Sequence, residues 1–422
     1  MQREKPAHER MNDLAPILRE NGGLGALLVD LTPLGQVELR YGSSAYAEVL
    51  DNATTLILEL SGTEMRGTDV VASSDRCGDG FLVFLSAPER GGAARLNELE
   101  TLAQRIENYL NVSLARLASP YLQGRTRIVV GYSLVLQNQL ISPERLVSRL
   151  IQDAWKCVNL VRSERQFRSR CLLQELLIHE EVGTVYQPIV DMTESKSMGF
   201  EALSRGPEGY RFQSPLDLFA TADEENLAFE LDRLCRRQAL KNAKGFPSEM
   251  KLFVNILPSS MYDPALQGDA MLRFLEEAGV EPKQLVFELT ESCVIENYTL
   301  FGDAVRQFTE LGIDIAIDDI GAGYSSLERI GWLQPKYLKF DICLIRHIDT
   351  TYARREMVRA LKVMADKMGS TVIAEGIERR EELETLLELG ITYGQGFLLG
   401  RPLPPAWKDG IGSLVAASAH CG

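Results

Sequence analysis

Residues 314–319 read DIAIDD, a short apolar run that ends in two adjacent aspartates, Asp318 and Asp319. Runs of the same kind, each closed by a carboxylate, an amide or a lysine, recur through the second half of the chain. They are MGFE ending at Glu201, LFVN at Asn255, LVFE at Glu288, KYLK at Lys339 and VIAE at Glu375. Their length and composition are typical of buried strands. The pattern therefore predicts a series of strands that each deliver a polar side chain at one end.

Two further apolar runs, TVYQPIV at 184–190 and GQGFLLG at 394–400, complete a set of eight predicted strands. Amphipathic helical patterns, such as those at 229–243, 302–312 and 355–369, separate most of these strands. Eight alternating units over about 240 residues fit an α/β fold of the TIM-like (β/α)8 barrel type. The C-terminal strand ends of such a barrel meet at one mouth, so we expect the polar side chains to gather there.

This group of side chains favours a metal-dependent chemistry. Its five carboxylates are Glu201, Glu288, Asp318, Asp319 and Glu375. Brought together, they would repel one another unless cations lay between them, although any one alone is more often a capping or solvated charge. Oxygen ligands select Mg²⁺ or Mn²⁺ over zinc or copper. The adjacent aspartates suit two metals roughly 3.5–4 Å apart, the arrangement that attacks phosphodiesters. The residues alone thus favour metal-assisted phosphodiester hydrolysis.

Composition excludes several other classes. The formal net charge of -14 over 422 residues argues against binding a nucleic acid polymer. The 4 histidines lie far apart, which disfavours a site of clustered histidines. The 7 cysteines are scattered and form no CxxC, which predicts reduced thiols in a cytoplasmic protein, with neither zinc site nor disulfide framework. A polar N-terminus and the lack of an apolar stretch of about 20 residues predict no signal peptide and no membrane insertion.

The first half of the chain predicts a smaller α/β domain. Buried strands are expected at LGALLVD (24–30) and RTRIVVGYSLV (125–135), and a strand–turn–strand unit around SSDRCGDGFLVFL (73–85). Helical patterns cover 43–60, 96–110 and 143–170. This alternation of helices and strands is typical of a layered α/β domain.

Several short motifs identify a family resemblance for the second half. They are QPI at 187–189, EALSR at 201–205, VN at 254–255, ELTES at 288–292, DDIGAGYSSL at 318–327, LKFD at 338–341, AEGIE at 374–378 and QGFLLGRPL at 395–403. In order and spacing they resemble the EAL-domain phosphodiesterases, which hydrolyse cyclic di-GMP to linear pGpG. The resemblance covers the entire second half.

The resemblance implies a role for each matched residue. Two divalent ions, Mg²⁺ or Mn²⁺, would be held by Glu201, Asn255, Glu288, Asp318, Asp319 and Glu375. The dinucleotide would contact Gln187, Leu203, Arg205, Asn255, Asp319 and Gln395, with Arg205 on a phosphate. Catalysis would rest on Lys339, Glu375 and Glu201: Lys339 orients the attacking water, and Glu375 either ligates a metal or acts as general base. Glu291 resembles the glutamate that anchors the loop after Asp319 and links the metal site to a dimer interface, so a homodimer is expected.

Three positions depart from the family pattern. Ile320 and Ala322 give DDIGAG where the family has DDFGTG, and Ser204 replaces a leucine in EALLR. The missing threonine hydroxyl removes a possible hydrogen bond of about 1 kcal/mol. None of these changes removes a predicted metal ligand, so we expect activity to be altered or regulated and not abolished.

The first half resembles a GGDEF diguanylate cyclase domain that has lost its chemistry. CGDGF at 77–81 has Cys77 in place of the first glycine and Gly80 in place of an acidic residue, and Thr32 stands where a second aspartate is expected after Asp30. A cyclase needs those acidic metal ligands, so we predict no cyclase activity. Arg66–Asp69 has the RxxD form of the family's inhibitory site, but its distance from the hairpin favours a surface turn.

The predicted organisation is a degenerate GGDEF-like regulatory domain at 1–165, a helical linker at 166–180 and an EAL phosphodiesterase barrel at 181–415. The first domain is left with dimerisation, signal input or binding of a signalling protein. Two other functions stay open. One is a receptor that binds cyclic di-GMP without turnover and relays binding to a partner protein. The other is a scaffold without nucleotide binding, which would have to retain the whole site by accident.

Overall fold

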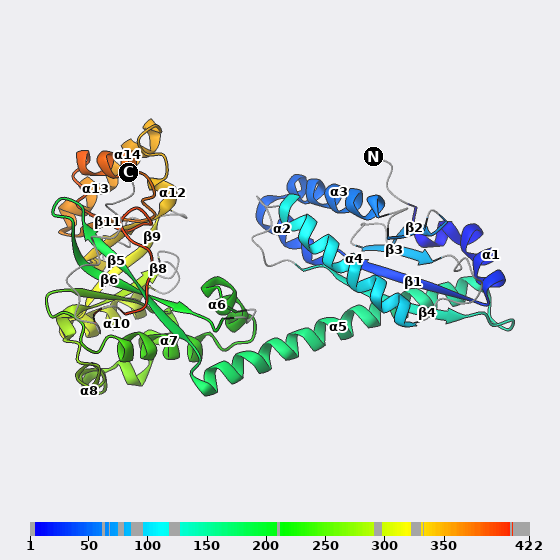
Figure 1. The fold of residues 1–422 in the computed structure, drawn as a ribbon, viewed down its shortest axis with the longest axis horizontal. Helices are drawn as coiled ribbons and strands as arrows, with labels where there is room; N and C mark the ends of the chain where they lie inside the picture. The colour runs from blue at the N-terminus through cyan, green and yellow to red at the C-terminus, as the bar shows by residue number, and fades with distance from the viewer. Residues whose placement is uncertain are drawn as a thin grey trace. The chain divides into compact units, whose positions relative to one another are not determined.

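The computed structural model describes residues 5–60, 64–66, 68–74, 80–85, 96–117, 127–208, 212–290, 298–321, 331, 333–405 and 407. The chain divides into two compact units, Met1–Arg170 and Cys171–Gly422, whose elements are labelled in Figure 1. Cys77, Glu291 and Ala322 lie outside the described residues, so the interpretations given to them stay predictions. Within the described residues, every helix is too short or too polar to cross a membrane.

The first unit contains one antiparallel sheet with the order β2-β3-β1-β4. Its strands are β1 (Gly23–Asp30), β2 (Val70–Ser73), β3 (Gly80–Leu85) and β4 (Val129–Leu136). Its helices are η1 (Ala7–Arg10), α1 (Met11–Asn21), η2 (Thr32–Leu34), α2 (Gly35–Tyr41), α3 (Ser43–Glu59), α4 (Leu96–Leu117) and α5 (Pro143–His179). The strands expected at 24–30 and 125–135 are present with slightly shifted bounds.

Strand β1 is buried on both faces, which makes the unit a three-layer structure. Leu27 and Val29 pack into one apolar cluster with α3 and α4. Ala26 and Leu28, which alternate with them along the strand, pack into a second cluster with α1 and α5. Because side chains alternate across a strand, the continuous apolar run of β1 requires a helical layer on each side.

Helix α5 is 37 residues long and continues past residue 170 to His179, through the segment where a helical linker was expected at 166–180. Its early residues, such as Leu150 and Val158, are buried against the sheet of the first unit. Its late residues Leu173 and Leu176 are buried in a cluster of the second unit with Leu231. The late apolar positions explain the extra length, because tertiary packing and not local propensity supplies most helical stability.

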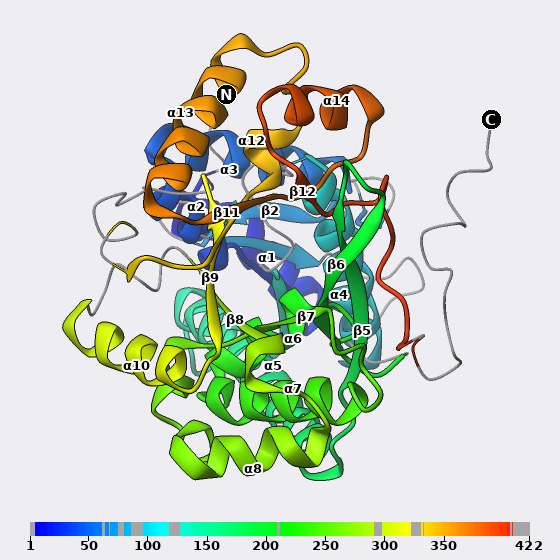
Figure 2. The ribbon, with the colours of Figure 1, turned by 90° about the vertical axis from the view of Figure 1, so that its left-hand side faces the viewer.

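The second unit is a closed barrel with the strand order β10-β11-β12-β5-β6-β7-β8-β9, seen in Figure 2. Its strands are β5 (Gly183–Asp191), β6 (Lys196–Arg205), β7 (Lys251–Asn255), β8 (Leu285–Thr290), β9 (Asp314–Ile320), β10 (Tyr337–Phe340), β11 (Thr371–Ala374) and β12 (Tyr393–Gly394). Its helices are α6 (Pro215–Glu224), α7 (Ala228–Asn242), η3 (Pro258–Tyr262), η4 (Pro264–Leu266), α8 (Gly268–Ala278), η5 (Pro282–Gln284), α10 (Tyr298–Glu310), α12 (Ile342–Ile345), α13 (Tyr352–Met368) and α14 (Arg380–Glu388).

The barrel is mixed, which corrects the expectation of a regular (β/α)8 barrel. Strand β5 runs antiparallel to both β6 and β12, whereas the other neighbours are parallel. The cause is the tight turn between β5 and β6, in which Asp191 accepts hydrogen bonds from Thr193 and Glu194 and Ser195 has a φ of 55°. A turn of this length can join only antiparallel strands.

The last strand is also shorter than expected. The apolar run GQGFLLG predicted a strand over 394–400, but β12 contains only Tyr393 and Gly394. After it, the backbone N–H of Gln395 donates to Ala374 and that of Leu398 donates to Ile377. The chain therefore turns toward the segment that follows β11, which brings Gln395 over the end of the barrel.

Alternation along the strands decides which side chains enter the barrel. On β10, Leu338 and Phe340 pack outward against the helices, while Tyr337 belongs to the inner cluster. Lys339 lies two residues after Tyr337 and therefore points inward at the C-terminal end. The same two-residue step places Glu288 after the inner Val286. Because alternate residues of each strand point into the barrel, the polar residues of the sequence pattern form a ring of inward-facing groups.

Candidate active site

The centre of the candidate site is the ammonium group of Lys339, whose side chain is 0% exposed. Its Nζ atom lies 2.6 Å from an oxygen of Glu375 and 2.7 Å from one of Glu288. Oxygens of Glu201 and Asp318 are each 3.3 Å away. Four carboxylates from four different strands or the residues directly after them therefore surround one lysine, although β6 continues four residues past Glu201 and does not end there as expected.

Three amide side chains connect this cluster to its surroundings. The Nδ2 atom of Asn255 donates to Glu201 at 3.0 Å and to Glu288 at 3.1 Å. The Nε2 atom of Gln395 donates to Glu201 at 2.7 Å and to Gln187 at 3.0 Å. Gln187 in turn donates to the carbonyl oxygen of Gly400 at 3.0 Å. These contacts fix both oxygens of Glu201 and hold the two glutamines side by side.

The electrostatics of the cluster follow from burial and mutual charge. Burial raises the pKa of Glu288 and of Glu375 well above the usual range. For Lys339, burial acts to lower the pKa, but Asp318 and the neighbouring glutamates outweigh it and raise the pKa well above its ordinary value. Burial also acts to raise the pKa of Glu201, yet Lys339 and the amide donors lower it overall. The lysine therefore remains an ammonium donor and cannot serve as a base.

The donor set fits two neighbouring divalent cations. Ligand atoms of Glu201, Glu288 and Asp318 lie within 4.8 Å of one another, and so do those of Asp318, Asp319 and Glu375. The two groups share Asp318, which is the arrangement that a pair of adjacent oxygen-ligated metals requires. Asn255 presents its amide nitrogen to the carboxylates, so ligation through its oxygen requires the amide to rotate.

Asp319 has an unusual backbone for a non-glycine residue. Its φ is 59°, in the left-handed region, directly after Asp318. Its backbone N–H donates to Oδ1 of Asp318 at 3.0 Å. Burial, followed by the charge of Asp318, raises the pKa of Asp319 to about 6. Strained backbone of this kind is concentrated at functional sites.

A cavity of about 240 Å³ opens beside the carboxylates. Its lining includes five residues predicted from sequence: Gln187, Glu201, Asp318, Glu375 and Gln395. It also includes five that sequence reasoning did not single out: Ile342, Gly376, Glu378, Gly396 and Phe397. All five lie two to four residues after a strand end, so proximity to the LKFD, AEGIE and QGF motifs was the available signal.

Two predicted substrate residues lie on β6 and are not part of this cavity lining. Leu203 pairs with Val185 in the β5–β6 ladder, and Arg205 ends the strand. The guanidinium of Arg205 donates to the carbonyl oxygen of Ser204 at 2.8 Å. The roles given to Leu203 and Arg205 therefore stay predictions.

Gly376 allows two segments of the cavity wall to approach closely. Its φ is 69°, and a Cβ atom at this position would lie 2.4 Å from Ile342. A side chain there would meet both a left-handed backbone and a side chain already in place. The loop after β11 can therefore lie against α12 only because this residue is a glycine.

The fold and the site define a mixed α/β barrel with a carboxylate–lysine cluster at its strand ends. The model of the EAL domain family matches residues 170–402, and the chain belongs to that family. This match accounts for the second unit and assigns no type to the first.

Similar proteins of known sequence extend over more of the chain. It is 28% identical over 410 residues to the cyclic di-GMP phosphodiesterase PdeR of Escherichia coli, covering 91% of this chain and 58% of that protein. It is 27% identical over 405 residues to the cyclic di-GMP phosphodiesterase NbdA of Pseudomonas aeruginosa, covering 91% and 49%. The chain thus spans about half the length of these curated relatives.

Solved structures agree with this barrel. The PaMucR phosphodiesterase in its c-di-GMP complex has a TM-score of 0.52 and 26% identity, and the match covers 56% of this chain and 98% of that one. The FimX EAL domain of Xanthomonas citri, in complex with c-diGMP, has a TM-score of 0.53 at 22% identity, with 58% and 96% covered. The second likeness shows the fold alone.

Proposed function

We propose that this chain hydrolyses cyclic di-GMP to linear pGpG at the Lys339 cluster. The observation that carries the proposal is the cluster itself, in which four carboxylates on or directly after four different strands surround one lysine beside an open cavity. PdeR and NbdA, which match over nine-tenths of this chain, are cyclic di-GMP phosphodiesterases. Their activity and this donor set point to the same reaction class.

Two divalent cations, Mg²⁺ or Mn²⁺, would be held by six side chains: Glu201, Asn255, Glu288, Asp318, Asp319 and Glu375. The excess of carboxylates over the single lysine supports this, because unbalanced buried charge is costly. When bound, such cations activate water and neutralise charge on a phosphodiester.

The chain's own residues would orient the reactants. Lys339 donates a hydrogen bond to the attacking water, whose oxygen bonds to phosphorus as one phosphodiester bond to a ribose breaks. Glu375, 2.6 Å from Nζ, either completes a metal site or accepts the proton of the water. Gln187 and Gln395 lie against the dinucleotide, and Arg205 holds a phosphate. Each of these roles follows the family motif at the same position.

The first unit would regulate this reaction without cyclase activity of its own. Asp30 is fully buried and forms an ion pair with Arg162 of α5. Thr32 donates to the same carboxylate from its backbone N–H at 3.0 Å and its hydroxyl at 2.6 Å. A protein cation and a threonine therefore occupy the oxygens that a cyclase would offer to a metal, which supports a role in signal input, dimerisation or partner binding.

The decisive experiment incubates the purified full chain with cyclic di-GMP and Mg²⁺ or Mn²⁺ and follows nucleotides by chromatography. We expect pGpG to appear, and to disappear with EDTA or in Glu201→Gln and Asp318→Asn variants, which keep the side-chain shape but lose a charge. Calorimetry with Mn²⁺ should show weaker metal binding in the same variants. Substantial turnover in either variant would contradict the two-metal assignment.

Binding of cyclic di-GMP without turnover would instead favour the receptor function. In that case the affinity should not depend on Mg²⁺ or Mn²⁺, since a receptor has no need of the hydrolytic cations. Absence of both binding and turnover would favour the scaffold and refute the proposal.

A further inference from the structure

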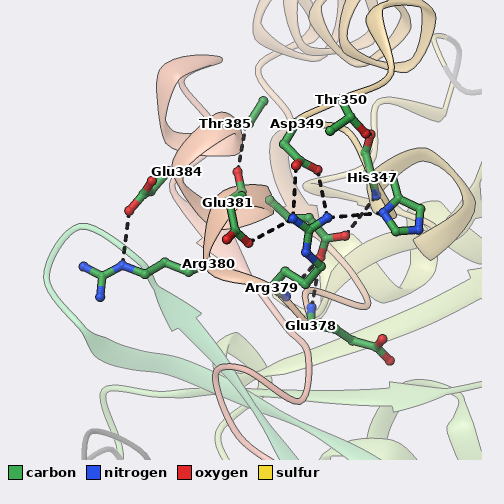
Figure 3. Close-up of polar contacts among 10 residues, drawn as sticks. His347, Asp349, Thr350, Glu378, Arg379, Arg380, Glu381, Glu384 and Thr385 are labelled. Atoms are coloured by element: carbon green, nitrogen blue, oxygen red, sulfur yellow. Dashed lines mark hydrogen bonds and ion pairs between the residues drawn. The ribbon is translucent and has the colours of Figure 1, made fainter. Parts of the chain in front are cut away.

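A second polar cluster lies next to the cavity, between the segment after β10 and the segment after β11. Ligand atoms of His347, Asp349 and Glu382 lie within 4.8 Å of one another, a spacing that metal ligands can adopt. Figure 3 shows the side chain of Arg379 reaching Asp349 and His347. The cluster therefore already contains a cation, the guanidinium group of Arg379.

Arg379 is the cationic part of this cluster. Its NH1 and NH2 atoms lie 3.3 and 3.2 Å from the two oxygens of Asp349, a two-pronged ion pair. NH1 also lies 3.2 Å from Nδ1 of His347, and NH2 lies 3.1 Å from Glu381. Because a guanidinium can only donate, Nδ1 of His347 is an acceptor and its proton sits on Nε2. The guanidinium of Arg379 thus occupies both oxygens of Asp349 and Nδ1 of His347, atoms through which these residues could hold an ion.

Glu382 is buried, with 1% of its surface exposed, and its carboxylate accepts hydrogen bonds from three backbone N–H groups. One oxygen accepts the backbone N–H of His347 at 2.9 Å. The other accepts the N–H groups of Glu378 and Arg379 at 3.2 and 3.1 Å. The carboxylate of Glu382 thus caps the start of its own helix, α14. It also binds the backbone of His347, which lies in the segment that follows β10.

The two segments that are joined in this way both contribute to the cavity. The first follows β10, which carries Lys339, and provides Ile342. The second follows β11 and provides Glu375, Gly376 and Glu378. Ile342 and Gly376 are in close approach, so a shift of one segment is transmitted to the other. The spacing of this cavity wall therefore depends on contacts that lie outside the cavity.

We propose that Arg379 and Glu382 are positioning residues, which hold the wall of Ile342, Gly376 and Glu378 at the spacing that the dinucleotide requires. This inference rests on the proposed function of the adjoining site. The two contacts are complementary: Glu382 fixes the backbone of both segments, and Arg379 fixes the side chains around them through Asp349. Neither residue is among those that line the cavity.

The test compares Arg379→Ala with Arg380→Ala in the full chain. Arg380 is the matched control because it is the next residue, is 85% exposed and pairs only along the helix with Glu384 among its described contacts, as Figure 3 also shows. We expect Arg379→Ala to raise KM for cyclic di-GMP about 10-fold or more, with kcat changed less, since a misplaced wall weakens binding. Arg380→Ala should keep both constants within about twofold.

Three further variants separate positioning from a loss of stability. Arg379→Lys keeps the charge but not the two-pronged geometry and should restore KM in part. The double variant Arg379→Ala/Asp349→Ala should raise KM no further than the single change, because both remove one contact. Glu382→Gln keeps one acceptor oxygen and should lie between the wild type and Arg379→Ala. Thermal unfolding of every variant is recorded beside the kinetics.

Binding is also measured by calorimetry with cyclic di-GMP in EDTA, where hydrolysis stops. A wild type that binds cyclic di-GMP in EDTA but does not hydrolyse it with Mg²⁺ or Mn²⁺ would refute the proposed function, and the positioning role of Arg379 and Glu382 would then be judged from Kd alone. Equal KM and Kd in Arg379→Ala and the wild type would overturn the positioning role of Arg379 and Glu382 while leaving hydrolysis intact. A change in KM that follows the fall in melting temperature across all variants would also overturn this positioning role. So would a wild type that does not bind cyclic di-GMP.

Discussion

The Nζ atom of Lys339 lies 2.6 Å from a carboxylate oxygen of Glu375, although Lys339 lies on β10, Glu375 directly follows β11, and the whole of α13 separates them in the sequence. Parallel pairing of β10 with β11 places Lys339 opposite Ile373. Glu375 lies two residues after Ile373 and therefore faces the inside of the barrel, as Lys339 does. Proximity of this acid and this ammonium is thus a direct result of strand register. The chemistry proposed for the cluster depends on that register.

Lys339→Ala should slow hydrolysis by at least about 100-fold while changing the Kd for cyclic di-GMP less than about tenfold. The reason is that a hydrogen bond to the attacking water acts mainly in the transition state. Single-turnover kinetics and calorimetry measure the two quantities. If binding is lost and the residual bound fraction turns over normally, the role given to Lys339 is wrong.

Lys251→Ala is the control for that change. Lys251 is the first residue of β7, at the end of the barrel opposite the site. Its Nζ atom lies 2.7 Å from a carboxylate oxygen of Asp314, which is the first residue of β9. Its loss removes a partly buried ion pair and should lower stability slightly, but kcat should stay within about twofold of the wild type. A comparable loss of kcat in both variants would point to general damage to the barrel.

Gly376→Ala should reduce kcat/KM by about tenfold or more, because its Cβ would lie 2.4 Å from Ile342 and displace the cavity wall. Gly369→Ala is the matched comparison. Gly369 also has a left-handed φ, 74°, but no atom lies within 4 Å of a Cβ built there. Both changes strain the backbone by about 1–2 kcal/mol, so a difference in steady-state kinetics isolates the contact. Equal activities would show that the approach to Ile342 is unimportant.

Arg236→Ala should destabilise the second unit by about 3–5 kcal/mol, because it leaves the buried carboxylate of Asp232 without its cation and Asp263 with only the exposed Arg233. Burial lowers the pKa of Arg236 to about 10, which still leaves it charged at neutral pH. Urea denaturation at neutral pH measures the deficit in the free energy of unfolding.

Arg233→Ala tests the specificity of that effect. Arg233 lies on the same helix, is 58% exposed and approaches Asp263 at 3.5 Å. Removing an exposed partner of this kind should change the free energy of unfolding by less than about 1 kcal/mol. If Arg233→Ala and Arg236→Ala proved equally unstable, burial would not be the cause.

Arg162→Ala should destabilise the first unit, because it leaves the fully buried carboxylate of Asp30 without a cation. The expected loss is about 3 kcal/mol, seen as faster hydrogen exchange of the β1 amides with little change in the barrel. Lys156→Ala, on the same helix but 72% exposed and paired with Asp153, should leave exchange unchanged. Unchanged exchange in Arg162→Ala would mean that Asp30 is satisfied by Thr32 alone.

Much of the barrel and its centre was predictable, because inward polar residues at strand ends break an otherwise apolar pattern. Glu288 and Asp318 stand out for this reason. The direction of β5 was not predictable from the same pattern, since parallel and antiparallel buried strands have the same composition. The signal for the antiparallel direction of β5 lay in the short turn around Thr193, which the side chain of Asp191 stabilises by accepting a hydrogen bond. A turn this short leaves no room for the longer connection that parallel strands need.

Other features left little trace in the sequence. The amide of Asn255 faces the carboxylates through its nitrogen, and a side-chain rotation of this kind has no sequence signature. Arg379 and Glu382 resemble the charged residues that begin many exposed helices. Their partners, His347 and Asp349, lie some thirty residues earlier. Contacts between segments that are far apart in sequence emerge only after the barrel has closed.

The ion pair between Arg162 and Asp30 gives the first unit an internal charge balance that requires nothing from solution. In the barrel, by contrast, the carboxylates exceed the one lysine that they surround. A change in the magnesium supply of the cell would therefore act on one half of the chain and leave the other as it was. Under the proposed function, the barrel would then lose the cations it needs for hydrolysis, while the buried charge of Asp30 stayed paired with Arg162.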